Sequence, residues 1–83
     1  MWSREELAAA DSDELAALAE LAMRTLAGRG EPAAFTHLLR MTSVAGECVG
    51  IAARSTAAAG SWAGVGELAG TTRQAAWERW RSP

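Results

Sequence analysis

Residues 61–80, SWAGVGELAGTTRQAAWERW, are the stretch around which the rest of the chain is organised. Ser61 is suited to cap a helix, and apolar residues recur after it at spacings of three and four, at Trp62, Val65, Leu68 and Ala69. Gly66 lies in the middle of this helix, where glycine is less favourable than alanine, and this indicates that another part of the backbone crosses close by. Gly70 follows the apolar face, where a glycine in the left-handed conformation ends a helix.

A second short helix is predicted after this glycine. Thr71 and Gln74 fit a T-x-x-Q capping box, which would open a helix over residues 72–81. Ala76 and Trp80 lie four apart and are expected to pack inward. The residues expected to face outward are Thr72, Arg73, Gln74 and Glu78. Two short helices joined by a three-residue turn follow the plan of a helix-turn-helix unit, which must lean on the preceding chain for stability.

The same stretch resembles small helix-turn-helix proteins and domains of actinobacteria, many of which end in a segment close to S-W-A-x-[VI]-G-x-x-L-G-[VT]-[ST]-R-Q-A-A-W-E-R-[FW]. The resemblance covers Ser61 to Trp80, about a quarter of the chain. Ala69 stands where a leucine is common and Thr71 where a valine is common, so the core of the unit itself is expected to be thin. The resemblance implies DNA binding.

The chain before this unit also reads as helical. Ser3 and Glu6 form a capping box for a helix within 3–10, and Asp11 with Glu14 supplies a second box, so the chain should break or bend around residues 11–12. The alternative is a continuous helix through this point, because none of these residues forbids it. A helix over 12–27 carries a stripe of Leu15, Leu18, Ala22 and Leu26. Pro32 suits the start of a helix running to residue 59. The prediction is an all-α fold of four to five helices, with a long central helix and a C-terminal helix-turn-helix without a wing.

The long helix is apolar over a wide arc, which predicts burial on two sides, one of them against a second protomer. Gly46 and Gly50 indicate either a close helix crossing or simply an alanine-rich composition. Cys48, the only cysteine, is expected to be a buried small hydrophobe, with redox sensing or an intermolecular bridge as alternatives. Arg40 and Arg54 are expected to be solvated, with a phosphate contact as the alternative for one of them.

Eighty-three residues predict a single domain, with a helical support and dimerisation region over 1–60 and the helix-turn-helix over 61–83. A chain of this size is marginal alone, so we expect a homodimer. The net charge of −2 is unevenly distributed. Through Ala27 two arginines face six carboxylates, 2 − 6 = −4, and from Gly28 onward six arginines face four, 6 − 4 = +2. The positive excess therefore accompanies the helix-turn-helix.

The residues do not form a recognisable catalytic or metal constellation, so no enzyme activity, cofactor or metal is expected. His37 is the single histidine and is expected to be an ordinary helix residue at a partly exposed position. There is neither a signal peptide nor an apolar run of the roughly 20 residues that a bilayer requires, so we expect a cytoplasmic protein without membrane contact.

The functional expectation is a sequence-specific regulator of transcription that binds double-stranded DNA with the helix over 72–81 in the major groove. Arg73 suits guanine and Gln74 adenine, although capping and solubility also explain this pair. Glu78 would accept from cytosine or repel wrong bases, and Trp77 would contact a thymine methyl or pack inward. The residues expected at phosphates are Ser61, Thr72, Arg79 and Arg81. The alternative is a protein-interaction module, such as an antitoxin or an accessory regulator, that binds another protein.

Overall fold

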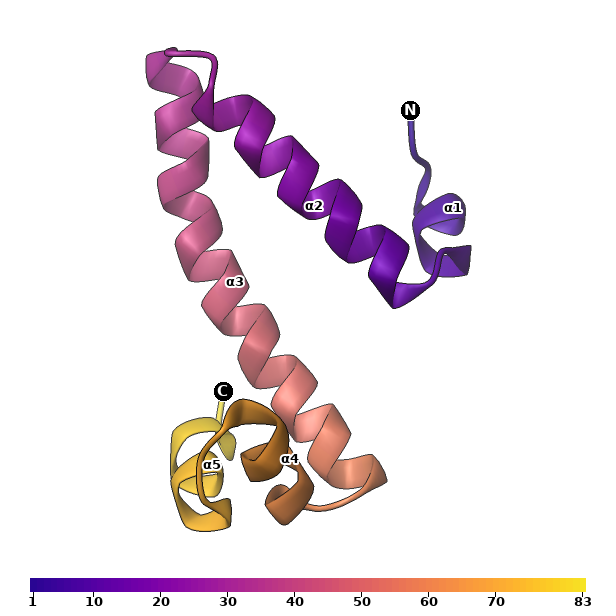
Figure 1. The fold of residues 1–83 in the computed structure, drawn as a ribbon, viewed down its shortest axis with the longest axis vertical. Helices are drawn as coiled ribbons and strands as arrows, with labels where there is room; N and C mark the ends of the chain where they lie inside the picture. Colours follow the sequence, from indigo (N-terminus) through magenta and orange to yellow (C-terminus); the bar gives the residue numbers. More distant parts are fainter. The chain divides into compact units, whose positions relative to one another are not determined.

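The computed structural model describes all 83 residues and contains helices only (Figure 1). The helices are α1 (Arg4–Ala9), α2 (Ser12–Ala27), α3 (Pro32–Ala59), α4 (Trp62–Ala69) and α5 (Arg73–Trp80). This confirms the all-α class, the long central helix and the packed C-terminal helix pair. No helix combines the length and the apolar character needed to cross a membrane. Backbone contacts group the chain into two compact units, residues 1–40 and 41–83.

Side-chain caps set the helix starts in residues 1–40. The Ser3 hydroxyl accepts the Glu6 amide at 3.1 Å, and the Glu6 carboxylate accepts the Ser3 amide at 3.2 Å, which completes the expected capping box. Ala10 is extended, and the Asp11 carboxylate accepts the Glu14 amide at 2.8 Å. The predicted break at residue 11 is therefore confirmed, because a helix cannot continue through the extended Ala10.

A short turn joins α2 to α3. Gly30 takes a φ of 66°, a left-handed conformation that glycine adopts without strain. Pro32 is the first residue of α3, where its missing amide hydrogen costs nothing because the first helical amides have no partner in the helix. Both helices have the bounds that the sequence predicted.

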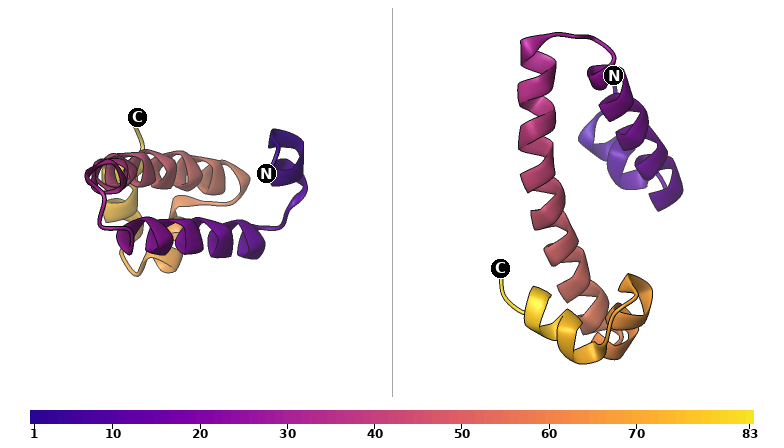
Figure 2. Two further views of the ribbon diagram at one scale, coloured as in Figure 1. Left: turned by 90° about the horizontal axis from the view of Figure 1, so that it is seen from above. Right: turned by 60° about the vertical axis from the view of Figure 1, so that its left-hand side comes forward.

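The core of residues 41–83 is small and made mainly of small side chains. Ala53 of α3, Val65 of α4 and Ala76 of α5 are buried together. Three further apolar side chains are partly buried against this core, namely Ala57, Trp62 and Trp80. Alanine at two of the three central positions lets the short helices α4 and α5 pack on the end of α3 (Figure 2). The helix pair thus depends on the preceding chain, as predicted.

Several apolar residues lie at the surface of the single chain, against expectation. Leu68 was expected on the inward face of α4 but is 81% exposed, and Cys48 is exposed rather than buried. Phe35, Val49 and Ile51 of α3 are each at least half exposed, so one side of α3 is uncovered in the single chain, and its burial against a second protomer stays a prediction. The reason is that α4 and α5 cover only the side of α3 that carries Ala53 and Ala57, the two α3 residues in their core.

Candidate nucleic-acid interface

The turn between α4 and α5 is held by two backbone hydrogen bonds. Gly70 lies in the left-handed region, with φ 71° and ψ 31°, as predicted. Its amide donates to the Glu67 carbonyl at 3.3 Å, and the Thr71 amide donates to the Gly66 carbonyl at 2.8 Å. This pair of bonds is the Schellman arrangement, which satisfies the last carbonyls of α4 and fixes the direction in which the chain leaves the helix.

Gly66 lies where the turn crosses α4. A Cβ atom on this residue would sit 2.9 Å from the Thr71 carbonyl oxygen and 2.9 Å from the carbonyl carbon and oxygen of Thr72. All three atoms belong to the backbone, so no side-chain rotation relieves the overlap. The predicted close backbone approach is confirmed, and the missing side chain sets how closely the turn lies on α4.

The cap of α5 is one residue later than expected. The Thr72 hydroxyl, not that of Thr71, accepts the Ala75 amide at 3.1 Å, and α5 begins at Arg73. Thr72 directly precedes the helix and, with φ −80° and ψ 160°, has the extended conformation of an N-cap residue, whereas the amide of Thr71 closes the Schellman turn on Gly66. The predicted 72–81 helix therefore consists of α5 and its two capping residues.

The inward and outward sides of α5 are as predicted. Ala76 is fully buried and Trp80 is half-buried, whereas Arg73, Gln74 and Glu78 are exposed. At about 100° per residue, Gln74 and Glu78 lie on the side of α5 opposite Ala76 and Trp80. Arg73 lies about 100° from Gln74 around the helix and is exposed because it is the first residue of α5. All three polar side chains are therefore open to a ligand, Gln74 and Glu78 from the outward face and Arg73 from the start of the helix.

Gln74 and Glu78 are joined by a hydrogen bond that the sequence analysis did not identify. The Gln74 Nε2 donates to the Glu78 Oε1 at 3.0 Å. The signal was present, because residues four apart on a helix are neighbours. The bond replaces the expected reach of Gln74 back to the start of α5. It uses one of the two Nε2 hydrogens, so the other hydrogen and the Oε1 remain for an adenine edge.

Two arginines near the end of α5 lie over tryptophan rings. The Arg81 guanidinium is 4.4 Å from the centroid of the Trp77 ring, and that of Arg79 is 5.0 Å from the Trp80 ring. Trp77 is half-buried, so part of its ring packs and part remains accessible. A guanidinium that stacks on an aromatic ring can still donate hydrogen bonds from its edge, so both groups keep the capacity to bind an anion.

Ser61 and Thr72 both cap helices. The Ser61 hydroxyl accepts the Gly64 amide at 3.0 Å, which confirms its predicted capping role and resembles the Thr72 contact. A capping hydroxyl that accepts an amide still has its own hydrogen to donate. Each residue is therefore equipped for a phosphate contact beside a helix N-terminus.

Arg54 was expected to be solvated but belongs to the packing of residues 41–83. It is half-buried, and its Nη1 donates to the Trp80 carbonyl at 3.0 Å. A cation beside the last carbonyls of a helix is favoured by the helix dipole and satisfies an acceptor that the helix leaves open. Arg54 thus ties the end of α5 to α3.

Comparison with protein-family models, curated proteins and solved structures found no match to this chain. The structure brings no group of three or more histidine, cysteine and carboxylate side chains together at a position where they could hold a metal ion. The candidate site consists of the exposed polar residues of α5 and the capping residues Ser61 and Thr72.

Proposed function

We propose that this chain is a sequence-specific regulator of transcription that binds double-stranded DNA as a homodimer. In this proposal α5 enters the major groove with its N-terminal residues at the base edges, the docking mode of helix-turn-helix proteins. The observation that carries the proposal is the exposure of Arg73, Gln74 and Glu78 on α5, which follows a turn that lies directly against Gly66 and contains the left-handed Gly70.

Each of the exposed residues Arg73, Gln74 and Glu78 would have a role suited to its chemistry. Arg73 would make a bidentate contact to guanine and Gln74 one to adenine. Glu78 would orient the Gln74 amide through their 3.0 Å hydrogen bond. Phosphate contacts from Ser61 and Thr72 would set the position of the helix on the duplex, because phosphate contacts fix register without reading sequence.

Two further phosphate contacts would come from the end of α5, in addition to those at its start. Arg79 and Arg81 would reach phosphate oxygens from the end of α5, where their tryptophan neighbours hold them. One α5 helix reads only about four base pairs, so selectivity requires two copies on an inverted repeat. The half-sites would be about 34 Å, one helical turn, apart.

Salt dependence of binding tests the proposal. Arg79 and Arg81 neutralise two phosphates per protomer, four in a dimer, which predicts a slope of log Kobs against log salt of about −3.6, since each contact contributes about −0.9. Affinity for genomic duplex fragments should therefore fall roughly 150-fold between 50 and 200 mM salt. Fluorescence anisotropy at the two concentrations measures this change. Absence of binding at 50 mM salt would refute DNA binding.

A second candidate function, docking of another protein, is favoured by an apolar groove within residues 41–83. The groove encloses about 260 Å³, and Leu68 at its side is 81% exposed. Its lining is formed by Val49, Ala52, Ala53, Thr56, Val65, Leu68, Ala69 and Trp80. Such a groove suits the apolar face of an amphipathic helix. No DNA binding at low salt, combined with capture of a helical peptide that Leu68→Glu abolishes, would favour this function.

A further inference from the structure

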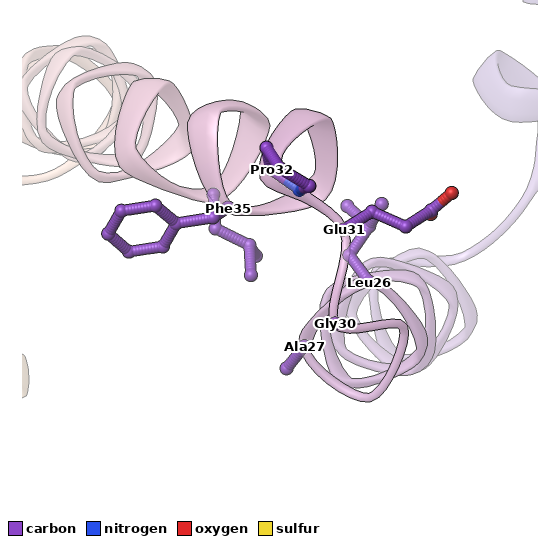
Figure 3. A pocket seen from close by; sticks show the side chains of 7 residues that line it. Leu26, Ala27, Gly30, Glu31, Pro32 and Phe35 are labelled. Atoms are coloured by element: carbon purple, nitrogen blue, oxygen red, sulfur yellow. The ribbon is translucent and has the colours of Figure 1, made fainter.

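Residues 1–40 contain too little core to be stable alone. Ala34 is the only buried side chain among them. Larger apolar side chains in the same unit are exposed, with Leu21 at 64% and Phe35 at 63%. A hollow of about 420 Å³ at the α2–α3 turn is lined by Leu26, Phe35 and other apolar residues (Figure 3). Helical segments of this size usually need a metal, a disulfide or association to fold.

One flank of α2 carries four residues that form a continuous row. Glu14, Ala17, Leu21 and Arg24 are spaced three, four and three apart, the spacing that aligns residues along one side of a helix. All four are exposed. The half-buried residues of α2 are Leu15, Leu18 and Leu26. Leu15 and Leu26 lie about 100° or more from the row's Glu14 around the helix, and Leu18 lies about 60° from Leu21, so the row borders the half-buried stripe and is itself uncovered in the single chain.

This row is complementary to itself when two helices run antiparallel. A two-fold axis near residue 19 places Glu14 opposite Arg24 of the second copy, and Ala17 opposite Leu21 of the second copy. Each of these pairs occurs twice, as an isologous contact requires. The small Ala17 leaves room for the large Leu21, so the two helices can approach closely. A parallel arrangement would instead oppose like charges at both ends of the row.

We propose that this flank of α2 is the contact between two copies of the chain, paired antiparallel about a two-fold axis near residue 19. The inference rests on the homodimer of the proposed function and names the surface that forms it. Asp13 and Glu14 lie in the first turn of α2 and Arg24 in the last, so the antiparallel orientation brings opposite charges together at both ends of the helix. None of the α5 residues assigned to DNA takes part in the contact.

Charge reversal in the full-length chain tests the contact. Glu14→Arg and Arg24→Glu each create two like-charge pairs, and each should raise the dimer dissociation constant by about tenfold or more at low salt. Sedimentation equilibrium measures the constants. An equimolar mixture of the two variants should form a heterodimer of near wild-type affinity, because every pair across that interface is again opposite in sign.

The double variant provides the matched control. Glu14→Arg combined with Arg24→Glu retains both unfavourable changes at the ends of the helix dipole but restores both pairs across the interface. It should therefore dimerise within about threefold of the wild type, well inside the roughly tenfold penalty of a single reversal. Helix content from circular dichroism, recorded before and after mixing the single variants, reports rescue even if one of them is unfolded alone.

The outcomes distinguish this contact from the homodimer itself. A wild-type chain that remains a monomer at every micromolar concentration tested would remove the homodimer from the proposed function. A wild-type dimer whose dissociation constant is unaffected by the single reversals, or is not restored by mixing them, would overturn only the α2 contact. Leu21→Glu should also abolish the dimer, whereas Ile51→Glu, at an exposed position of α3 outside the apolar groove, should leave it intact.

Discussion

Replacing Arg73 with alanine is expected to abolish sequence-selective DNA binding while leaving the melting temperature of the chain unchanged. A bidentate arginine–guanine contact contributes about 1–3 kcal/mol of discrimination, and a dimer makes it twice. Affinity for an operator selected from a random library should fall by about 30-fold or more. Stability should be preserved because Arg73 is exposed at the start of α5.

The matched control for this variant is Arg29→Ala. Arg29 is exposed in the turn between α2 and α3, and its replacement removes the same charge without touching α5. Its effect on operator affinity should be small, and anisotropy titrations of the two variants side by side separate base recognition from net charge. Wild-type affinity of Arg73→Ala for the selected operator would show that the reading residues are wrongly assigned.

Gly66→Ala is expected to destabilise the chain by about 2 kcal/mol. Alanine gains roughly 1 kcal/mol in helix propensity over glycine, but its Cβ would meet backbone atoms of the turn at 2.9 Å, and forcing such overlaps costs about 1–3 kcal/mol or more. The backbone overlap decides the sign because neither α4 nor the turn can rotate away from it. The melting temperature should fall by roughly 10 °C, as measured by circular dichroism.

Gly46→Ala is the control for this substitution. Gly46 also lies within a helix, but nothing approaches within 4 Å of the position its Cβ would take. The change should therefore stabilise the chain by up to about 1 kcal/mol. A Gly66→Ala variant as stable as the wild type would show that the turn does not press against residue 66.

The local chemistry of the helix ends could be predicted from the sequence. The capping role of Ser61 and the left-handed conformation of Gly70 were predicted correctly, because the structure at a helix end is decided mainly by residues close in the sequence. Gly66 was informative for the same reason, since a glycine within a helix costs stability and needs a compensating contact. The cap of α5 was predicted one residue too early because two adjacent threonines can both cap a helix, and the sequence does not show that the turn extends through Thr71 before α5 begins at Arg73.

Contacts between distant parts of the chain could not be predicted. The apolar arc of α3 predicted burial, but the pattern does not say which segment would cover it, so Cys48 was placed in a core that the single chain lacks. Arg54 bonds a carbonyl 26 residues away, and no sequence spacing signals such a bond. Leu68 follows the inward period of α4, yet α4 is covered only around Val65 and Gly66.

Amide chemical-shift mapping of the full chain on addition of a selected duplex tests the central claim most directly. The account predicts that the largest shifts fall at residues 61–64 and 71–78, the caps and the exposed face of α5, and that they weaken as salt is raised. The Arg73→Ala variant should lose them. Spectra that do not change at low salt, or shifts confined to the apolar groove around Val49 and Leu68, would contradict the account.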